Sequence, residues 1–212
     1  MRSGVLFDLD GTLIDSRADL ALAVNLTRED LGLPPLPQAQ VVGYVGEGVR
    51  RLLARALPEC PDRLEEALVV NRRHYHAHLL DQTRLYPGVR PAMERMWGMG
   101  IPLMVVTNKP GEFAGRILEG LDVARFVAAV VGGGDCPRLK PDPAPLLFAL
   151  ERAGCGVVGS WMAGDHFTDL EAGRRAGLKR CYCRYGFGDP GAEAWDLAVD
   201  DLGDLADVLR PG

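Results

Sequence analysis

The chain has 212 residues, of which 47% are hydrophobic and 25% are charged, and its formal net charge is −5. This is ordinary globular composition, and the chain is long enough to bury a core without disulfide or metal staples. The sequence has neither a basic run nor an apolar stretch of membrane-spanning length, so we expect no nucleic-acid partner and no membrane partner. The five cysteines include no Cys-x-x-Cys pair, and no leader precedes the first predicted strand. We therefore expect a cytoplasmic protein, either a monomer or a homodimer.

The first predicted strand is an apolar run, residues 5–7, that leads directly into Asp8 and Asp10. Such a run is typical of a buried strand, and Gly11 allows a sharp turn after it. Side chains at i and i+2 of a strand point to the same side, so Asp8 and Asp10 are expected to share one small space. A magnesium ion beside them would offset the repulsion between the two carboxylates. An isolated Asp-x-Asp is also compatible with a solvated polar turn.

Residues 16–84 carry helix patterns and no convincing strand. Amphipathic helices are predicted over residues 17–31, 49–57 and 62–80, with proline-rich or glycine-rich connectors between them. Asp15 or Ser16 is a candidate N-cap of the first helix. We predict that residues 16–84 form an all-helical cap domain, inserted between the two parts of a core domain, residues 1–15 and 85–212.

Helix and strand patterns alternate from residue 88 onward. Strands are predicted over residues 101–106, 126–131, 158–163, 179–184 and 197–199, and helices over residues 89–99, 110–121, 142–153, 167–176 and 202–209. This alternation predicts an α/β fold with a Rossmann-like parallel sheet and helices on both faces. The carboxyl ends of parallel strands lie at one edge of the sheet, where ligands bind in open α/β folds.

Polar residues follow four of the predicted strands and are expected to meet at that edge. They are Asp8 and Asp10, then Thr107 and Asn108, then Lys140, then Asp165 and Asp169. Taken singly, each signal has another explanation, such as a helix cap or a solvated surface lysine. Together, four carboxylates, a hydroxyl, an amide and an ammonium suit a phosphoryl group accompanied by magnesium.

Each group in this set suits one part of phosphoryl transfer. A carboxylate can attack phosphorus to form an aspartyl phosphate, and a second carboxyl can protonate the leaving alkoxide and later deprotonate water. The hydroxyl, the amide and backbone N–H groups can hold the transferring oxygens, while a lysine neutralises charge. The metal reduces the repulsion between the nucleophile and the phosphate.

These motifs resemble those of the haloacid dehalogenase superfamily. Residues 8–12 match its first motif, Thr107-Asn108 the second, Lys140 the third, and Gly164-Asp165 with Asp169 the fourth. The resemblance covers nearly the whole chain, including a helical cap inserted after the first motif. His166 stands where a serine is expected in this family, although a helix-capping histidine also fits that position.

The resemblance implies a role for each matched residue. Asp8 is the implied nucleophile and Asp10 the implied general acid and base. Magnesium is implied to be held by Asp8, by the backbone carbonyl of Asp10 and by Asp165, while Asp169 supports the metal site or orients Lys140. The dehalogenase and phosphonatase branches lack an acid at position 10, so Asp10 indicates a phosphatase or a phosphomutase.

The substrate depends on the cap, where the sequence is less informative. Arg50 or Arg51 is a candidate ligand for a second anion, and solvated surface arginines fit equally well. Segments 44–50, 83–89 and 133–141 resemble those of bacterial phosphoglycolate phosphatases, which implies hydrolysis of a small phosphorylated metabolite, 2-phosphoglycolate. The alternatives are a β-phosphoglucomutase-like phosphomutase, a phosphatase for another small ester or pyrophosphate, and a non-catalytic binding protein on the same fold.

Overall fold

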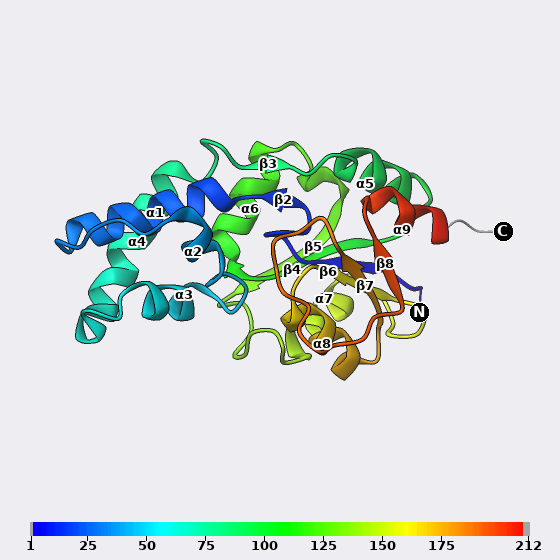
Figure 1. Ribbon diagram of the computed structural model, residues 1–212. Helices are drawn as coiled ribbons and strands as arrows, with labels where there is room; N and C mark the ends of the chain where they lie inside the picture. The colour runs from blue at the N-terminus through cyan, green and yellow to red at the C-terminus, as the bar shows by residue number, and fades with distance from the viewer. Residues whose placement is uncertain (1, 210–212) are drawn as a thin grey trace.

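The computed structural model describes residues 2–209, which form an α/β core with a helical cap at one end (Figure 1). The core is built on six parallel strands in the order β5-β4-β1-β6-β7-β8. They are β1 (Val5–Phe7), β4 (Leu103–Pro110), β5 (Val127–Gly133), β6 (Trp161–Gly164), β7 (Lys179–Cys183) and β8 (Leu197–Val199). The strand order reverses between β1 and β6, which is the point of such a sheet where ligands bind.

Helices cover both faces of the sheet, and the apolar side chains of β1 alternate between the two faces. Val5 and Phe7 pack with α5 (Val89–Gly98), α6 (Gly111–Gly120) and α9 (Leu202–Val208). Leu6 packs on the other face with α7 (Ala144–Arg152) and α8 (Phe167–Ala176). These three residues of β1 are fully buried. Asp8, which begins the first motif, therefore comes directly after a strand at the centre of the core. The predicted α/β fold with helices on both faces is confirmed.

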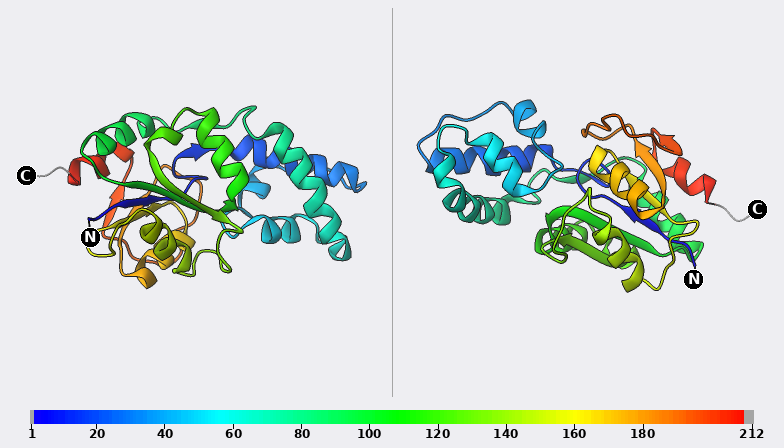
Figure 2. Two further views of the ribbon diagram at one scale, coloured as in Figure 1. Left: turned by 180° about the vertical axis from the view of Figure 1, so that it is seen from behind. Right: turned by 90° about the horizontal axis from the view of Figure 1, so that it is seen from below.

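The cap has its own apolar cluster and lies beyond the carboxyl ends of the strands (Figure 2). Its helices are α1 (Arg17–Asp30), α2 (Gln38–Val42), α3 (Val49–Ala56), the 3₁₀ turn Pro61–Arg63 and α4 (Leu64–His78). The chain enters the cap through β2 (Ile14–Asp15) and leaves it through β3 (Arg84–Leu85), which pair antiparallel. Buried Asp19 accepts hydrogen bonds from the backbone N–H groups of Gln82 and Thr83 and so joins the two crossing segments.

The structure differs from the predicted elements mainly at the crossing between cap and core. The short strands β2 and β3 and helix α2 are not predicted from the sequence. Ser16 occupies the N-cap position of α1, but its hydroxyl donates to Asp10 Oδ1 instead of capping the helix. Within residues 2–209, none of the helices has both the length and the apolar character needed to cross a bilayer.

Candidate active site

A cavity of about 490 Å³ lies between the core and the cap, at the carboxyl ends of the central strands. The sequence-predicted residues that line it are Asp8, Asp10, Thr107, Asn108 and Asp165. Lys140, 3% exposed, and Asp169, fully buried, lie beneath this lining. The fold therefore brings together all the polar residues predicted at the strand ends.

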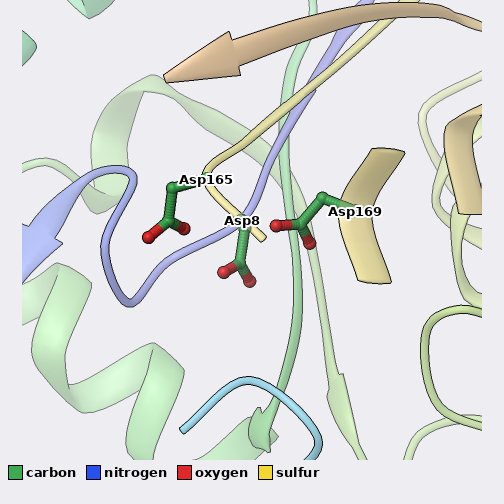
Figure 3. A group of neighbouring side chains, drawn as sticks. All are labelled: Asp8, Asp165 and Asp169. Atoms are coloured by element: carbon green, nitrogen blue, oxygen red, sulfur yellow. The ribbon is translucent and has the colours of Figure 1, made fainter. Parts of the chain in front are cut away.

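Three of the predicted carboxylates form a compact group at the base of this site (Figure 3). Asp8, Asp165 and Asp169 each offer an oxygen atom, and these atoms all lie within 4.8 Å of one another. Burial raises the pKa of Asp8 from 3.8 to about 6, and burial raises the pKa of Asp165 well above its ordinary value. A buried group made only of oxygen donors, with more negative than positive charge, suits a hard divalent cation such as Mg²⁺.

Lys140 is the cation inside this acidic group. Its Nζ donates to Asp8 Oδ1 and Asp169 Oδ1 at 2.7 Å each, and to the Val106 carbonyl at 2.5 Å. Burial acts to lower the pKa of Lys140, but Asp169 and Asp8 outweigh that effect and raise it. Asn108 fixes the lysine backbone through two hydrogen bonds of 2.9 Å, one in each direction.

The carboxylate of Asp165 is held by backbone groups from a turn far away in the sequence. The N–H groups of Phe187 and Gly188 donate to its Oδ2 at 3.0 and 2.7 Å, and the Thr12 hydroxyl donates to Oδ1 at 3.2 Å. Gly11 has a positive φ of 84°, and a Cβ there would lie 2.0 Å from Asp165 Oδ2. Glycine is therefore required both by the turn and by this close approach.

Asp10 lies in the same cavity as Asp8 but has its own partners. Its Oδ1 accepts from Ser16 Oγ at 2.5 Å and from Lys109 Nζ at 2.7 Å. Lys109 is 7% exposed and was not identified from the sequence. Its position directly after Thr107 and Asn108, at the end of a buried strand, is the signal that would have found it.

Comparison with known proteins places these motifs in a family. The profile of the haloacid dehalogenase-like hydrolases matches residues 5–183. The chain belongs to this family. The phosphoglycolate phosphatase of Chromobacterium violaceum is 35% identical, and the alignment covers 98% of this chain and 96% of that protein. The phosphoglycolate phosphatase of Neisseria meningitidis is 38% identical, with 98% and 93% covered.

A solved structure agrees with this assignment. The crystal structure of a predicted phosphoglycolate phosphatase from Haemophilus somnus superposes with a TM-score of 0.91 at 28% identity, covering 99% of this chain and 98% of that chain. The haloacid dehalogenase resemblance of the motifs is thus confirmed. The chain is a phosphoric monoester hydrolase of the haloacid dehalogenase family, and its substrates are small phosphorylated molecules.

In this haloacid dehalogenase-like hydrolase, a glycine-rich cap loop closes over the core motifs. Asn108 Nδ2 donates to the Gly46 carbonyl at 2.9 Å. Gly46 has a φ of 115°, and a Cβ there would lie 2.7 Å from the His166 ring. His166 caps α8 by accepting from the Thr168 N–H, while Asp169 accepts from the His166 N–H. Burial lowers the pKa of His166.

The structure does not bring Arg50 to the cavity, contrary to the role expected for it. Its guanidinium pairs with Glu65 at 2.6 Å, and both side chains are more than half exposed. Arg51 pairs with Glu47 instead and is also exposed. Gly48, the N-cap of α3, and Val49, its first residue, line the cavity, whereas Arg50 and Arg51 project toward solvent.

Proposed function

We propose that this hydrolase is a magnesium-dependent phosphomonoesterase that works through an aspartyl phosphate on Asp8 and that its substrate is 2-phosphoglycolate. The observation that carries the mechanism is the buried group of Asp8, Asp165 and Asp169 around Lys140, beside the cavity. The similarity to phosphoglycolate phosphatases over almost the whole chain supports the substrate.

The chemistry of the donor set fits a magnesium ion. In this proposal the ion is held by the carboxylates of Asp8 and Asp165 and by the backbone carbonyl of Asp10, with Asp169 in the same group. When bound, the ion supplies positive charge that makes the approach of an anionic nucleophile to a phosphate dianion tolerable.

The residues of the chain carry the two chemical steps. Asp8 attacks phosphorus while the carboxyl of Asp10 gives its proton to the departing alkoxide. Asp10 then takes a proton from water, which attacks phosphorus and frees Asp8 and inorganic phosphate. Thr107 and Asn108 bind the transferring oxygens, and Lys140 holds Asp8 in place and neutralises its charge.

The cap sets the boundary of the reaction chamber. We propose that residues 16–84 act as one domain on a core made of residues 1–15 and 85–212. The two short strands β2 and β3 carry the chain across this boundary, and the Gly46 loop contacts Asn108 on the core side. A cap over a small substrate excludes bulk water from the aspartyl phosphate.

A phosphate-release screen tests the proposal. The panel contains 2-phosphoglycolate, other small phosphomonoesters, β-glucose 1-phosphate and pyrophosphate, each with magnesium and with excess chelator. We expect magnesium-dependent release that is fastest with 2-phosphoglycolate. Isomerised sugar phosphate would support the phosphomutase, faster pyrophosphate cleavage would change the substrate, and no release from any compound would contradict the enzyme itself.

A further inference from the structure

Lys109 is a buried cation on the cavity wall, and it has no role in the chemical steps proposed above. Its ammonium donates to Asp10 Oδ1 at 2.7 Å and to the hydroxyl of Tyr75 at 2.5 Å. The ammonium also lies 4.7 Å from the centroid of the Tyr75 ring. Asp10 and Lys109 belong to the core, whereas Tyr75 belongs to α4 of the cap. Lys109 therefore joins the proposed acid–base group to the cap.

Tyr75 is placed by a contact between α4 and the start of α6. Its ring packs edge-on against Phe113, with centroids 5.1 Å apart and an interplanar angle of 89°. One turn earlier, Arg72 forms an ion pair of 2.6 Å with Glu112. We call these two contacts the α4–α6 seat. Because the seat joins cap to core, the Tyr75 hydroxyl reaches Lys109 only when the cap rests on the core.

The hydrogen bonds of Asp10 divide its two carboxylate oxygens. Both protein donors, Ser16 and Lys109, bond Oδ1. Within residues 2–209, Oδ2 has no protein hydrogen-bond partner, and Asp10 lines the cavity. Two hydrogen bonds to Oδ1 fix the orientation of the Asp10 carboxylate and therefore the direction of Oδ2. Oδ2 is then the oxygen that exchanges a proton with substrate and water.

We propose that Lys109 is a positioning residue for Asp10 and that the cap engages it through Tyr75, so that seating α4 on α6 aligns the general acid and base. This inference rests on the proposed function, because it takes Asp10 to be that group. The proton moves between Asp10 Oδ2 and either the leaving oxygen or the attacking water. Lys109 keeps its protons throughout and orients the carboxylate.

The test separates the two chemical steps by the choice of leaving group. p-Nitrophenolate departs without a proton, so formation of the phosphoenzyme from p-nitrophenyl phosphate does not need Asp10, whereas its hydrolysis does. Rapid-quench measurements give the p-nitrophenol burst and the amount of phosphoenzyme. The variants are Tyr75→Phe, which keeps the ring against Phe113, and Lys109→Met, with Asp10→Asn as the reference.

In Tyr75→Phe and Lys109→Met we expect a burst rate within about twofold of wild type and phosphoenzyme hydrolysis slowed about tenfold or more, part of the range that acid–base catalysis supplies. The phosphoenzyme then accumulates, as it does in Asp10→Asn. With an alkyl phosphate both steps slow, so kcat falls while KM is unchanged. Tyr44→Phe is the matched control, since within residues 2–209 its hydroxyl has a single hydrogen-bond partner, Gln40, in an exposed contact within the cap.

Four results would overturn the proposal, the last of them together with the proposed function. Wild-type kinetics in Tyr75→Phe would show that the cap does not act through Lys109. Burst and hydrolysis falling in parallel would show a merely structural role for the pair. A higher KM for 2-phosphoglycolate, with ethyl phosphate unaffected, would make Lys109 a substrate ligand. Absence of phosphoenzyme in all variants, Asp10→Asn included, would instead contradict the proposed function and the role of Lys109 with it.

Discussion

Two buried lysines pair with three of the four carboxylates of the site, while Asp165 is held by backbone N–H groups and the Thr12 hydroxyl. Lys140 pairs with Asp8 and Asp169, and Lys109 pairs with Asp10. The side chains of both lysines are at most 4% exposed. The charge of each buried lysine is therefore compensated by its carboxylate partner rather than by water. Removing one member of a buried pair leaves an uncompensated charge, which is far more costly than losing an exposed pair.

Lys140→Met is therefore expected to be strongly destabilising. In chelator at neutral pH, the free energy of unfolding should fall by about 3 kcal/mol, because Asp8 and Asp169 are left without their cation. Urea denaturation measures this change. Lys179→Met is the matched control, since Lys179 is exposed. An equal effect of the two substitutions would mean that Lys140 does not compensate the buried acids.

Asp8→Asn separates catalysis from folding at the same site. The amide cannot form an aspartyl phosphate, so we expect turnover to fall by about 10³-fold or more. The metal-free protein should be at least as stable as wild type near neutral pH, because the substitution removes a carboxylate whose ionisation burial disfavours, while Lys140 keeps Asp169 as its partner. Activity and thermal unfolding are measured on the same samples. A variant that keeps wild-type turnover would exclude Asp8 as the nucleophile.

At the scale of elements, the turn after β7 holds the Asp165 carboxylate in place, although it carries none of the predicted motifs. Residues 185–188 supply two N–H donors to Asp165, and the Tyr185 hydroxyl donates to the Thr12 carbonyl at 2.9 Å. A Cβ on Gly186 would lie 2.3 Å from Asp165 Cβ and 2.4 Å from the Gly11 carbonyl oxygen. The turn and the first motif therefore leave no space for a side chain between them.

Gly186→Ala tests this packing. The added methyl must displace Asp165 or the Gly11 backbone, so we expect lower stability. We also expect the apparent affinity for magnesium to fall by about tenfold, because groups that hold a metal ligand in place affect metal binding to that degree. Titration of activity against magnesium, together with thermal unfolding, measures both. Gly115→Ala in α6 is the control, because a Cβ there meets nothing within 4 Å. It should stabilise the helix by about 0.5–1 kcal/mol.

Sequence patterns predicted the elements of the core well because the central strands β1, β4 and β6 are short apolar runs that lead into polar residues. The predicted helix 167–176 and strand 197–199 coincide with α8 and β8. The polar residues at strand ends were found because parallel strands share one edge. Tyr75 was missed because its contact with Lys109 joins residues 34 positions apart, one in the cap and one in the core, which no local pattern encodes. Arg50 was expected at the cavity because it lies at the start of a cap helix. The sequence does not fix the orientation of α3 about its own axis, and in the structure Arg50 faces solvent.

At the scale of the whole molecule, core and cap together line one cavity, and the buried carboxylates beside it carry an electrostatic penalty in the metal-free protein. Burial raises the pKa of Asp8 to about 6, and it raises the pKa of Asp165 as well. A carboxyl whose pKa is raised on folding contributes stability that is complete below its unfolded value of 3.8 and is lost as the pH rises through about 6. In the proposed site, magnesium would bind the ionised carboxylates and so offset that loss.

Removing the metal should therefore matter more at higher pH. We expect metal-free stability to fall between about pH 5 and about pH 7.5 by roughly 2 kcal/mol, and magnesium to raise the unfolding temperature more at the upper pH. Thermal unfolding in chelator and in magnesium at both pH values gives the four unfolding temperatures to be compared. A magnesium effect that is equal at the two pH values would show that these carboxylates do not bind the ion.

Transient phosphorylation of Asp8 is the step on which the proposed mechanism depends. The direct measurement is acid quench of the enzyme during turnover of 2-phosphoglycolate, followed by peptide mass spectrometry to locate the phosphoryl group. We expect the mass of one phosphoryl group on the peptide containing Asp8, with none in Asp8→Asn. A phosphoryl group on another residue, or wild-type turnover with no phosphopeptide at any quench time, would contradict it.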